Sequence, residues 1–252
     1  MDELLVDDDD GVRTITINRP EAKNALSSAM RAHLCSLLSD SERDAGIRAL
    51  VITAVDPVFS AGVDFKEVST TGSTWNPHDA QFSVNPGSAL RAMLTPVICA
   101  VNGACVSGGL EIALSSSFIV ASEHARFADT HARLGVVATW GLTALLPRAV
   151  GIRKAREMSI TGNFVGADEA LRLGLVNHVV PHDELRAFAC KLATDVAATP
   201  AVAEIMRLYA RGDGKSLADA LALETDHVTR RASFDAKAFG EAGRATAARN
   251  KP

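Results

Sequence analysis

The chain has 252 residues, of which 47% are hydrophobic and 22% charged, a balance typical of a globular protein that buries a sizeable core. Its net charge of -4 and its aromatic fraction of 5% exclude a basic or base-stacking surface for nucleic acid. No apolar run reaches the ~18 residues of a membrane span, and the acidic N-terminus is unlike a secretory signal. The four cysteines form neither a CxxC pair nor a zinc-like cluster. We therefore expect a soluble protein of a reducing compartment, the cytoplasm, without a membrane or nucleic-acid partner.

The N-terminal segment predicts two strands followed by a helix. The acidic run 7–10 and Gly11 predict a solvated turn between the strands, because four adjacent carboxylates cannot converge on one metal ion. Residues 12–18 alternate apolar and polar side chains, which predicts a strand that stops before Pro20. Asn24 is the expected N-cap of the following helix. The apolar face of that helix comprises Leu26, Met30, Leu34, Leu37 and Leu38.

The middle of the chain continues the alternation of strands and helices. Continuous apolar runs over 49–55, 96–101 and 117–121 predict strands buried on both faces. Between them, residues 59–67 predict a loop that turns into a helix, and Gly108-Gly109 opens a second helix. The segment 69–87 is polar without a period, so it is either a mobile flap near a site or a surface excursion. This order predicts an α/β fold.

From Gly141 onward the pattern becomes mainly helical. A short helix over 167–173 ends at Gly174, and a strand over 175–180 follows it. Apolar residues at helical spacing over 185–196 predict a further helix, and two amphipathic helices are predicted over 216–231 and 234–248. Since there is no Pro/Gly-rich linker, we place the boundary between a core, residues 1–195, and a C-terminal helical region, residues 196–252, on this change of pattern alone.

Two glycine-containing segments, residues 59–67 and 102–111, lie between a predicted strand and a predicted helix. Glycine lets the backbone approach a ligand, and a helix start presents free N–H groups with partial positive charge. Close helix packing explains a Gly-Gly pair equally well. Neither segment is a P-loop, and no G-x-G-x-x-G follows the first strand, so the pattern excludes a standard nucleotide site.

Taken together, these segments resemble the crotonase (enoyl-CoA hydratase/isomerase) superfamily, and the bacterial enoyl-CoA hydratases most closely. The resemblance covers nearly the whole chain and implies an α/β spiral of ββα repeats followed by helices. It also implies an acyl-CoA substrate, no metal or redox cofactor, and a homotrimer or hexamer formed through residues 196–252. The motifs that carry it are Asn18-Arg19-Pro20, Asn24-Ala25-Leu26, residues 60–64 and 102–111, Ala125-Arg126-Phe127, Leu134-Gly135-Val136, Thr161-Gly162, residues 167–170, residues 174–177 and Val179-Val180-Pro181.

The resemblance assigns the thioester-binding positions residue by residue. The backbone N–H groups of Val63 and Gly108 correspond to the oxyanion hole, in which two preorganised donors stabilise charge on the thioester oxygen. Val63 replaces the usual Ala, which a main-chain donor tolerates. Lys66 is either a phosphate contact or an exposed lysine without a ligand. Coenzyme A is expected along Ala61, Gly62, Val63, Asp64, Phe65 and Lys66, with Ala22 and Lys23 near its adenine end.

Glu111 and His131 are the predicted proton-transfer residues. Glu111 matches the first catalytic glutamate of the hydratases, and its small apolar neighbourhood favours function over a merely stabilising helix N-terminal charge. The second glutamate is absent, and His131 stands in its place. An imidazole can accept and donate a proton near neutral pH, with Asp129 or Arg133 tuning it.

The resemblance therefore implies a lyase that adds water syn to a 2-enoyl-CoA thioester. The histidine leaves alternatives open: another crotonase-type reaction (isomerase, hydrolase or lyase), or a CoA-thioester-binding subunit without turnover. Trp140 follows the His131 segment and either walls the acyl pocket or packs in the core.

Overall fold

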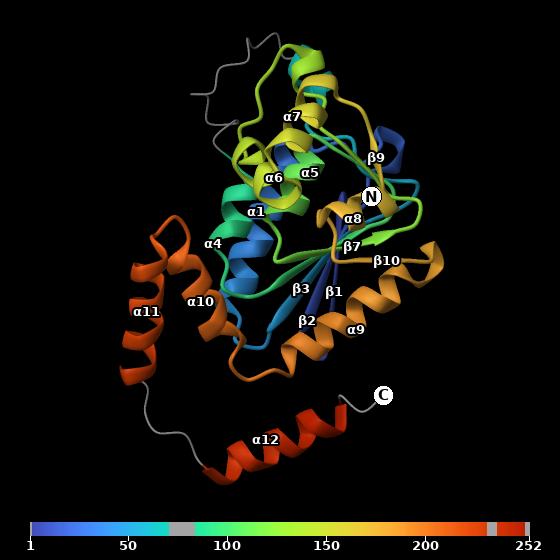
Figure 1. Cartoon of the computed structure of the whole chain (residues 1–252). Coiled ribbons are helices and arrows are strands. Elements are labelled where there is room, and N and C mark those ends of the chain that lie inside the picture. Colours follow the sequence, from blue (N-terminus) through green and yellow to red (C-terminus); the bar gives the residue numbers. More distant parts are fainter. Residues whose placement is uncertain (1, 71–83, 231–235, 250–252) are drawn as a thin grey trace. The chain divides into compact units, whose positions relative to one another are not determined.

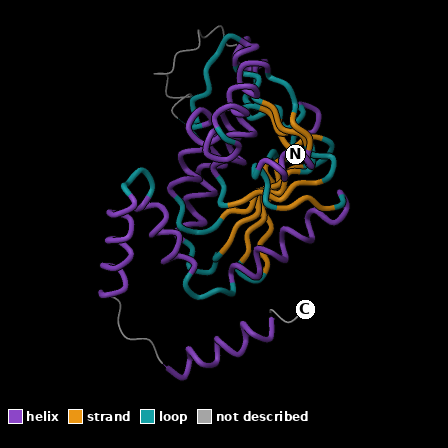
Figure 2. The backbone as a smooth tube through the Cα atoms, in the orientation of Figure 1, coloured by secondary structure: helices purple, strands orange, loops and turns teal. Residues whose placement is uncertain are grey.

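The computed structural model of the chain describes residues 2–70, 84–230 and 236–249, and its centre is built from two sheets (Figures 1 and 2). In this described part the larger sheet has the order β1-β2-β3-β5-β7-β10 and the smaller one β4-β6-β8-β9. The bounds are β1 Leu4–Asp9, β2 Val12–Ile17, β3 Ala49–Ala54, β5 Val97–Val101, β7 Phe118–Ser122 and β10 His178–Val180; then β4 Val58–Ser60, β6 Ala104–Val106, β8 Arg126–Ala128 and β9 Val165–Gly166.

Successive strand pairs divide between the two sheets. β3, β5 and β7 are parallel neighbours in the large sheet, and β4, β6 and β8, which follow them in the chain, are parallel neighbours in the small sheet. Helices follow these pairs, among them α2 (Phe65–Thr70) after β4 and α5 (Gly108–Ser115) after β6. The predicted α/β spiral of ββα repeats is thus confirmed.

The large sheet is covered on both faces, which explains its continuous apolar strands. In β3, Ala49 and Val51 pack with α9 (Leu185–Ala197), whereas Leu50 and Ile52 belong to the core cluster on the other face, with α1 (Ser28–Arg43). Figure 1 shows α9 lying along the sheet. Alternate side chains of a strand point to opposite faces, so a strand buried on both faces has no polar side to display.

Further helices pack on α1 and α5, on one another and on the short strands β8, β9 and β10. Their bounds are α4 Pro86–Ala92, α6 Leu142–Val150, α7 Ile152–Thr161 and α8 Ala167–Leu173, with short 3-10 turns at Pro20–Ala22, Ala132–Leu134 and His182–Glu184. Gly174 ends α8 in a left-handed conformation, with φ of 77°, as the sequence predicts. The predicted strand 175–180 is shorter than expected, because only 178–180 pair with β7.

The turn predicted over residues 7–11 is confirmed at Asp10 and Gly11. β1 and β2 form an antiparallel hairpin that pairs Asp9 with Val12, and Asp10 and Gly11 have φ of 43° and 78°. The strand extends further into the run than predicted, since Asp7 and Asp8 belong to β1. Aspartate tolerates the left-handed region better than most residues, and glycine adopts it freely, so the pair suits this turn.

The predicted N-cap at Asn24 is wrong. Ser27 caps α1, because its Oγ accepts a hydrogen bond from the Met30 N–H. Asn24 is fully buried, with φ of 53°. Its Oδ1 accepts from the Arg19 N–H, and its Nδ2 donates to the carbonyl oxygens of residues 55 and 58. The amide therefore satisfies backbone groups at residues 19, 55 and 58, partners that the local helix pattern does not reveal.

The C-terminal helices form a separate compact unit. Contacts divide the chain into Met1–Ala203 and Glu204–Pro252. The helix α10 (Val202–Gly212) was not predicted, whereas α11 (Leu217–Arg230) and α12 (Ala236–Arg249) match the two expected amphipathic helices. The predicted boundary at residue 195 and the trimerisation role stay predictions. Most of the polar segment 69–87 lies outside the described residues, and within those residues no helix is long and apolar enough to cross a membrane.

Candidate active site

The predicted site residues follow the carboxyl ends of three neighbouring parallel strands. Gly62 and Val63 follow β4, Gly108 follows β6, and His131 follows β8. Since β6 lies between β4 and β8 in the small sheet, Gly108 is placed between the segment that follows β4 and the segment that follows β8. The sheet edge where parallel strands end is a common place for ligands, because the loops that follow converge there.

The Val63 and Gly108 backbones approach each other closely. A methyl group on Gly62 would lie 3.2 Å from the Gly108 nitrogen, and one on Gly108 would lie 3.4 Å from the Val63 nitrogen. Leu26 pairs with this segment by donating to the Gly62 carbonyl and accepting from the Asp64 N–H, so the Val63 N–H faces away from Leu26. Within the described residues, neither the Val63 nor the Gly108 N–H donates to another group.

The two adjacent glycines have different roles. Gly108 leaves space beside the Val63 N–H, which a ligand requires. A methyl group on Gly109 would instead lie 2.8 Å from the Ser60 Cβ, a distance that real Cβ atoms do not show. Gly109 therefore allows α5 to pack directly on the end of β4, so close packing explains this glycine, while ligand binding at Gly108 stays a prediction.

Glu111 is almost completely buried, with 2% of its surface exposed. Its Oε1 accepts hydrogen bonds from the Trp140 N–H at 2.6 Å and the Leu142 N–H at 3.3 Å. Burial raises the pKa of this carboxyl group, although the two N–H donors and His131 partly oppose the increase. A buried carboxyl with a raised pKa is suited to accept a proton and release it again.

The burial of Glu111 leads to a prediction about stability. The raised pKa means that the folded state disfavours the ionised form of Glu111. The contribution of this carboxyl group to the free energy of unfolding is therefore fully present below its ordinary pKa and is lost as the pH rises through its raised pKa. Glu111→Gln keeps the acceptor for Trp140 and has no charge to bury. We expect it to raise the free energy of unfolding by about 1 kcal/mol near neutral pH, and the gain to vanish in acid. Thermal melts of both proteins across pH measure this; an equal or lower melting temperature at neutral pH would contradict it.

His131 connects Glu111 to a second buried carboxylate. Its Nδ1 lies 2.6 Å from Asp129 Oδ1, and its Nε2 lies 3.8 Å from Glu111 Oε2. Burial alone would raise the pKa of Asp129, but hydrogen bonds from His131 and Ser159 outweigh it, so the pKa is lowered and the group is ionised. The ionised carboxylate therefore accepts a hydrogen bond from Nδ1, and Nε2 is the ring nitrogen on the side of Glu111.

Of the two residues expected to tune His131, Asp129 contacts it and Arg133 does not. The Arg133 guanidinium donates to the Thr161 carbonyl and to Asn163 Oδ1. This side chain holds the 3-10 turn after His131 against the end of α7. Ser159 was missed at the sequence level, because it lies 30 residues from Asp129 and no local pattern links the two positions.

Trp140 lies between the candidate oxyanion hole and α1. Its Cζ3 would be 3.1 Å from a methyl group on Gly108, and its ring lies 5.8 Å from the guanidinium carbon of Arg31. Arg31 is buried, and burial lowers its pKa. The sequence did not single out this cation, which stacks on the ring across the core. Trp140 is thus in place to border the site, while its predicted contact with an acyl chain stays a prediction.

The two segments predicted to hold coenzyme A are neighbours. The Ala61 N–H donates to the Lys23 carbonyl at 3.1 Å, which places residues 22–23 beside residues 61–62. Asp64 uses its side chain internally: Oδ1 accepts from the N–H groups of residues 66 and 67 at the start of α2, and Oδ2 accepts from Arg19. Phe65 and Lys66 are exposed. A ligand could therefore contact the backbone of residues 61–66 and the side chains of Phe65 and Lys66.

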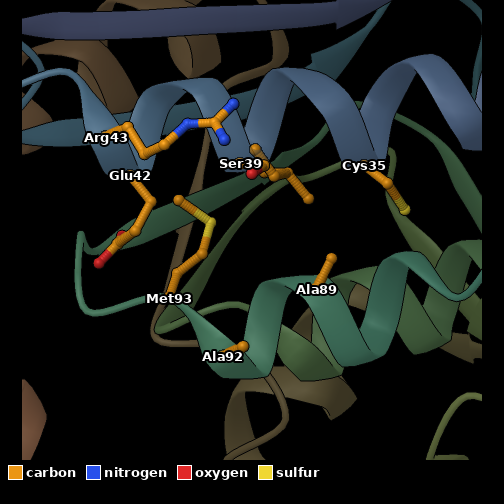
Figure 3. A pocket seen from close by; sticks show the side chains of 8 residues that line it. Cys35, Ser39, Glu42, Arg43, Ala89, Ala92 and Met93 are labelled. Atoms are coloured by element: carbon orange, nitrogen blue, oxygen red, sulfur yellow. The ribbon is translucent and has the colours of Figure 1, made fainter.

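A separate pocket of about 290 Å³ lies between α1 and α4 (Figure 3). Cys35 and Ser39 of α1 face Ala89 of α4 and Met93, the residue after α4, across it, and none of its lining residues belongs to the predicted site. Its carboxylate, Glu42, accepts hydrogen bonds from the N–H groups of residues 94 and 95. In the part of the chain that the structure describes, no cluster of His, Cys, Asp and Glu could hold a metal ion.

Comparisons with known proteins agree with this architecture. The family model for enoyl-CoA hydratase/isomerase matches residues 7–242. The crystal structure of an enoyl-CoA hydratase from Mycobacterium tuberculosis H37Rv is 44% identical, with a TM-score of 0.76 over 91% of this chain and 98% of that one. A short-chain-enoyl-CoA hydratase of Clostridium acetobutylicum is 32% identical over 96% of this chain and 89% of its own. A probable enoyl-CoA hydratase of Mycobacterium bovis is 36% identical over 88% and 86%. The chain therefore belongs to the enoyl-CoA hydratase/isomerase family.

Proposed function

We propose that this protein is an enoyl-CoA hydratase, a lyase that adds water syn across the double bond of a 2-enoyl-CoA thioester. The observation that carries the proposal is the pair of proton acceptors, Glu111 Oε2 and His131 Nε2, which lie 3.8 Å apart. This separation is too long for a direct hydrogen bond, and it allows one water molecule to donate to both atoms. Such a water would have its lone pairs free to attack a carbon atom.

The oxyanion hole would supply the electrostatic part of the reaction. When water adds to Cβ, negative charge develops on the thioester carbonyl oxygen. The N–H groups of Val63 and Gly108, held close together and without another acceptor in the described residues, are suited to stabilise that charge. Losing one such donor typically reduces the rate by ~10²–10³-fold.

Proton transfer would use His131 and Glu111 together. As the water oxygen bonds to Cβ, one of its protons passes to His131 Nε2, and Asp129 stabilises the resulting imidazolium across 2.6 Å. The imidazolium then gives that proton to Cα of the enolate, so the product has gained H and OH. Glu111 accepts the second hydrogen bond of the water and orients it.

Substrate binding completes the proposal. The backbone from Ala61 to Lys66 and the neighbouring Ala22 and Lys23 would hold coenzyme A, and Trp140 would border the acyl group. We also propose a homotrimer or a hexamer and a cytoplasmic location. The exposed apolar side chains of α10 and α11, including Tyr209 and Leu217, support a subunit contact there.

Loss of the enoyl-thioester absorbance with crotonyl-CoA tests the function directly. Saturable turnover by the wild type, with 3-hydroxybutyryl-CoA as the product, is expected. Tight binding of crotonyl-CoA without turnover would overturn hydratase activity for this substrate. It would favour the alternatives, another crotonase-type reaction or a CoA-thioester-binding subunit.

A further inference from the structure

Ser107 occupies a backbone conformation that serine rarely adopts. Its φ is 47° and its ψ is -106°, which lies outside the small left-handed region that side chains tolerate. A strained, buried residue at the end of β6 persists only where its surroundings hold it in place. Its N–H donates to the Ala128 carbonyl at 2.9 Å, and its own carbonyl accepts from the Glu111 N–H at 2.9 Å.

The hydroxyl group of Ser107 does not cap the helix that it precedes. A serine at the N-cap usually accepts a hydrogen bond from the second or third N–H of its own helix, whereas α5 has no side-chain cap. The Ser107 Oγ instead lies 2.8 Å from Thr130 Oγ1 and accepts from the Thr130 N–H at 3.0 Å. The unusual backbone conformation thus turns the side chain away from α5 and toward the residue that precedes His131.

Ser107 is therefore linked to three parts of the candidate site. The residue after it is Gly108, its carbonyl bonds to the residue that would orient water, and its hydroxyl holds Thr130, which lies between Asp129 and His131. We propose that Ser107 is a positioning residue that sets the oxyanion donor Gly108 at a fixed distance from His131. The inference rests on the proposed function, because it assigns those two groups to one reaction.

Paired substitutions at both ends of the contact test this role. Ser107→Gly removes the hydroxyl and accommodates the positive φ, so a folded protein is expected. Thr130→Val removes the other hydroxyl and keeps the shape, and Thr130→Ser is the conservative variant that restores it. We expect kcat for crotonyl-CoA to fall about tenfold in Ser107→Gly and in Thr130→Val with little change in KM. Thr130→Ser should recover most of that loss, and the double variant Ser107→Gly/Thr130→Val should be no slower than the slower single variant.

A spectroscopic measurement separates this inference from the proposed function. Hexadienoyl-CoA is a chromophoric thioester whose absorbance shifts to longer wavelength when donors polarise its carbonyl. We expect this shift on binding to the wild type and a smaller shift in Ser107→Gly. A wild type that binds and shifts hexadienoyl-CoA without hydrating crotonyl-CoA would overturn the hydratase, and a smaller shift in Ser107→Gly would then still support the role of Ser107 in placing the Gly108 donor.

Other outcomes would overturn the role of Ser107. Wild-type kcat and a wild-type absorbance shift in Ser107→Gly would show that the hydroxyl positions nothing. Multiplying losses in the double variant would show that the two hydroxyl groups act independently. The absence of any shift in the wild type would overturn both this inference and the oxyanion hole.

Discussion

Replacing Glu111 with glutamine is expected to lower kcat for crotonyl-CoA hydration by about 10²-fold, because the carboxylate that orients the attacking water beside His131 is lost. The amide oxygen can still accept the N–H groups of Trp140 and Leu142, so the fold around α5 should persist. What is lost is the carboxylate Oε2 that faces His131. KM should change much less than kcat, because coenzyme A is expected to bind elsewhere, along residues 61–66.

The matched control is Glu184→Gln, which makes the same chemical change at an exposed position on the 3-10 turn before α9. It should retain wild-type kcat and KM. Steady-state kinetics and thermal melts of the two variants together separate chemistry from folding. Wild-type kcat in Glu111→Gln would remove Glu111 from the mechanism. A loss of kcat in Glu184→Gln as large as that in Glu111→Gln would point to a general effect of replacing a glutamate.

Replacing His131 with glutamine is expected to lower kcat by about 10²-fold. Glutamine is of similar size and polar, but it can neither accept a proton from water nor hold a charge opposite Asp129. The paired change Asp129→Asn should produce a loss of the same kind, because an amide can donate to Nδ1 and so place the proton on Nε2, the atom that must accept one. Measurement of kcat for both variants and the double variant tests whether they act as one unit.

His33→Gln is the control for this substitution, since His33 is an exposed histidine on α1. It should behave as the wild type. Retained turnover in His131→Gln would show that the histidine is structural and that Glu111 acts alone. Losses that multiply in the double variant with Asp129→Asn would show that Asp129 acts on something other than His131.

Much of the architecture follows from local patterns. The apolar runs over 49–55 and 96–101 predict strands buried on both faces, and each becomes a strand between α9 and the opposite core. The Gly-Gly pair predicts the start of a helix, and this start places Glu111, three residues after Gly108, in the first turn of α5. These features depend on neighbours within one or two turns of the chain, which is the range that periodicity and glycine placement report.

The contacts that make the site specific were decided by tertiary structure. Asn24 was predicted to cap a helix, but its amide binds backbone groups of loops up to 34 residues away. Asp129, and not Arg133, holds His131, and Ser107 reaches Thr130 across 23 residues. By itself, the sequence determined which side chains are available and which segments follow a strand. Which of those side chains meet depends on the order of β4, β6 and β8 in the small sheet, because long-range packing places the strand ends side by side.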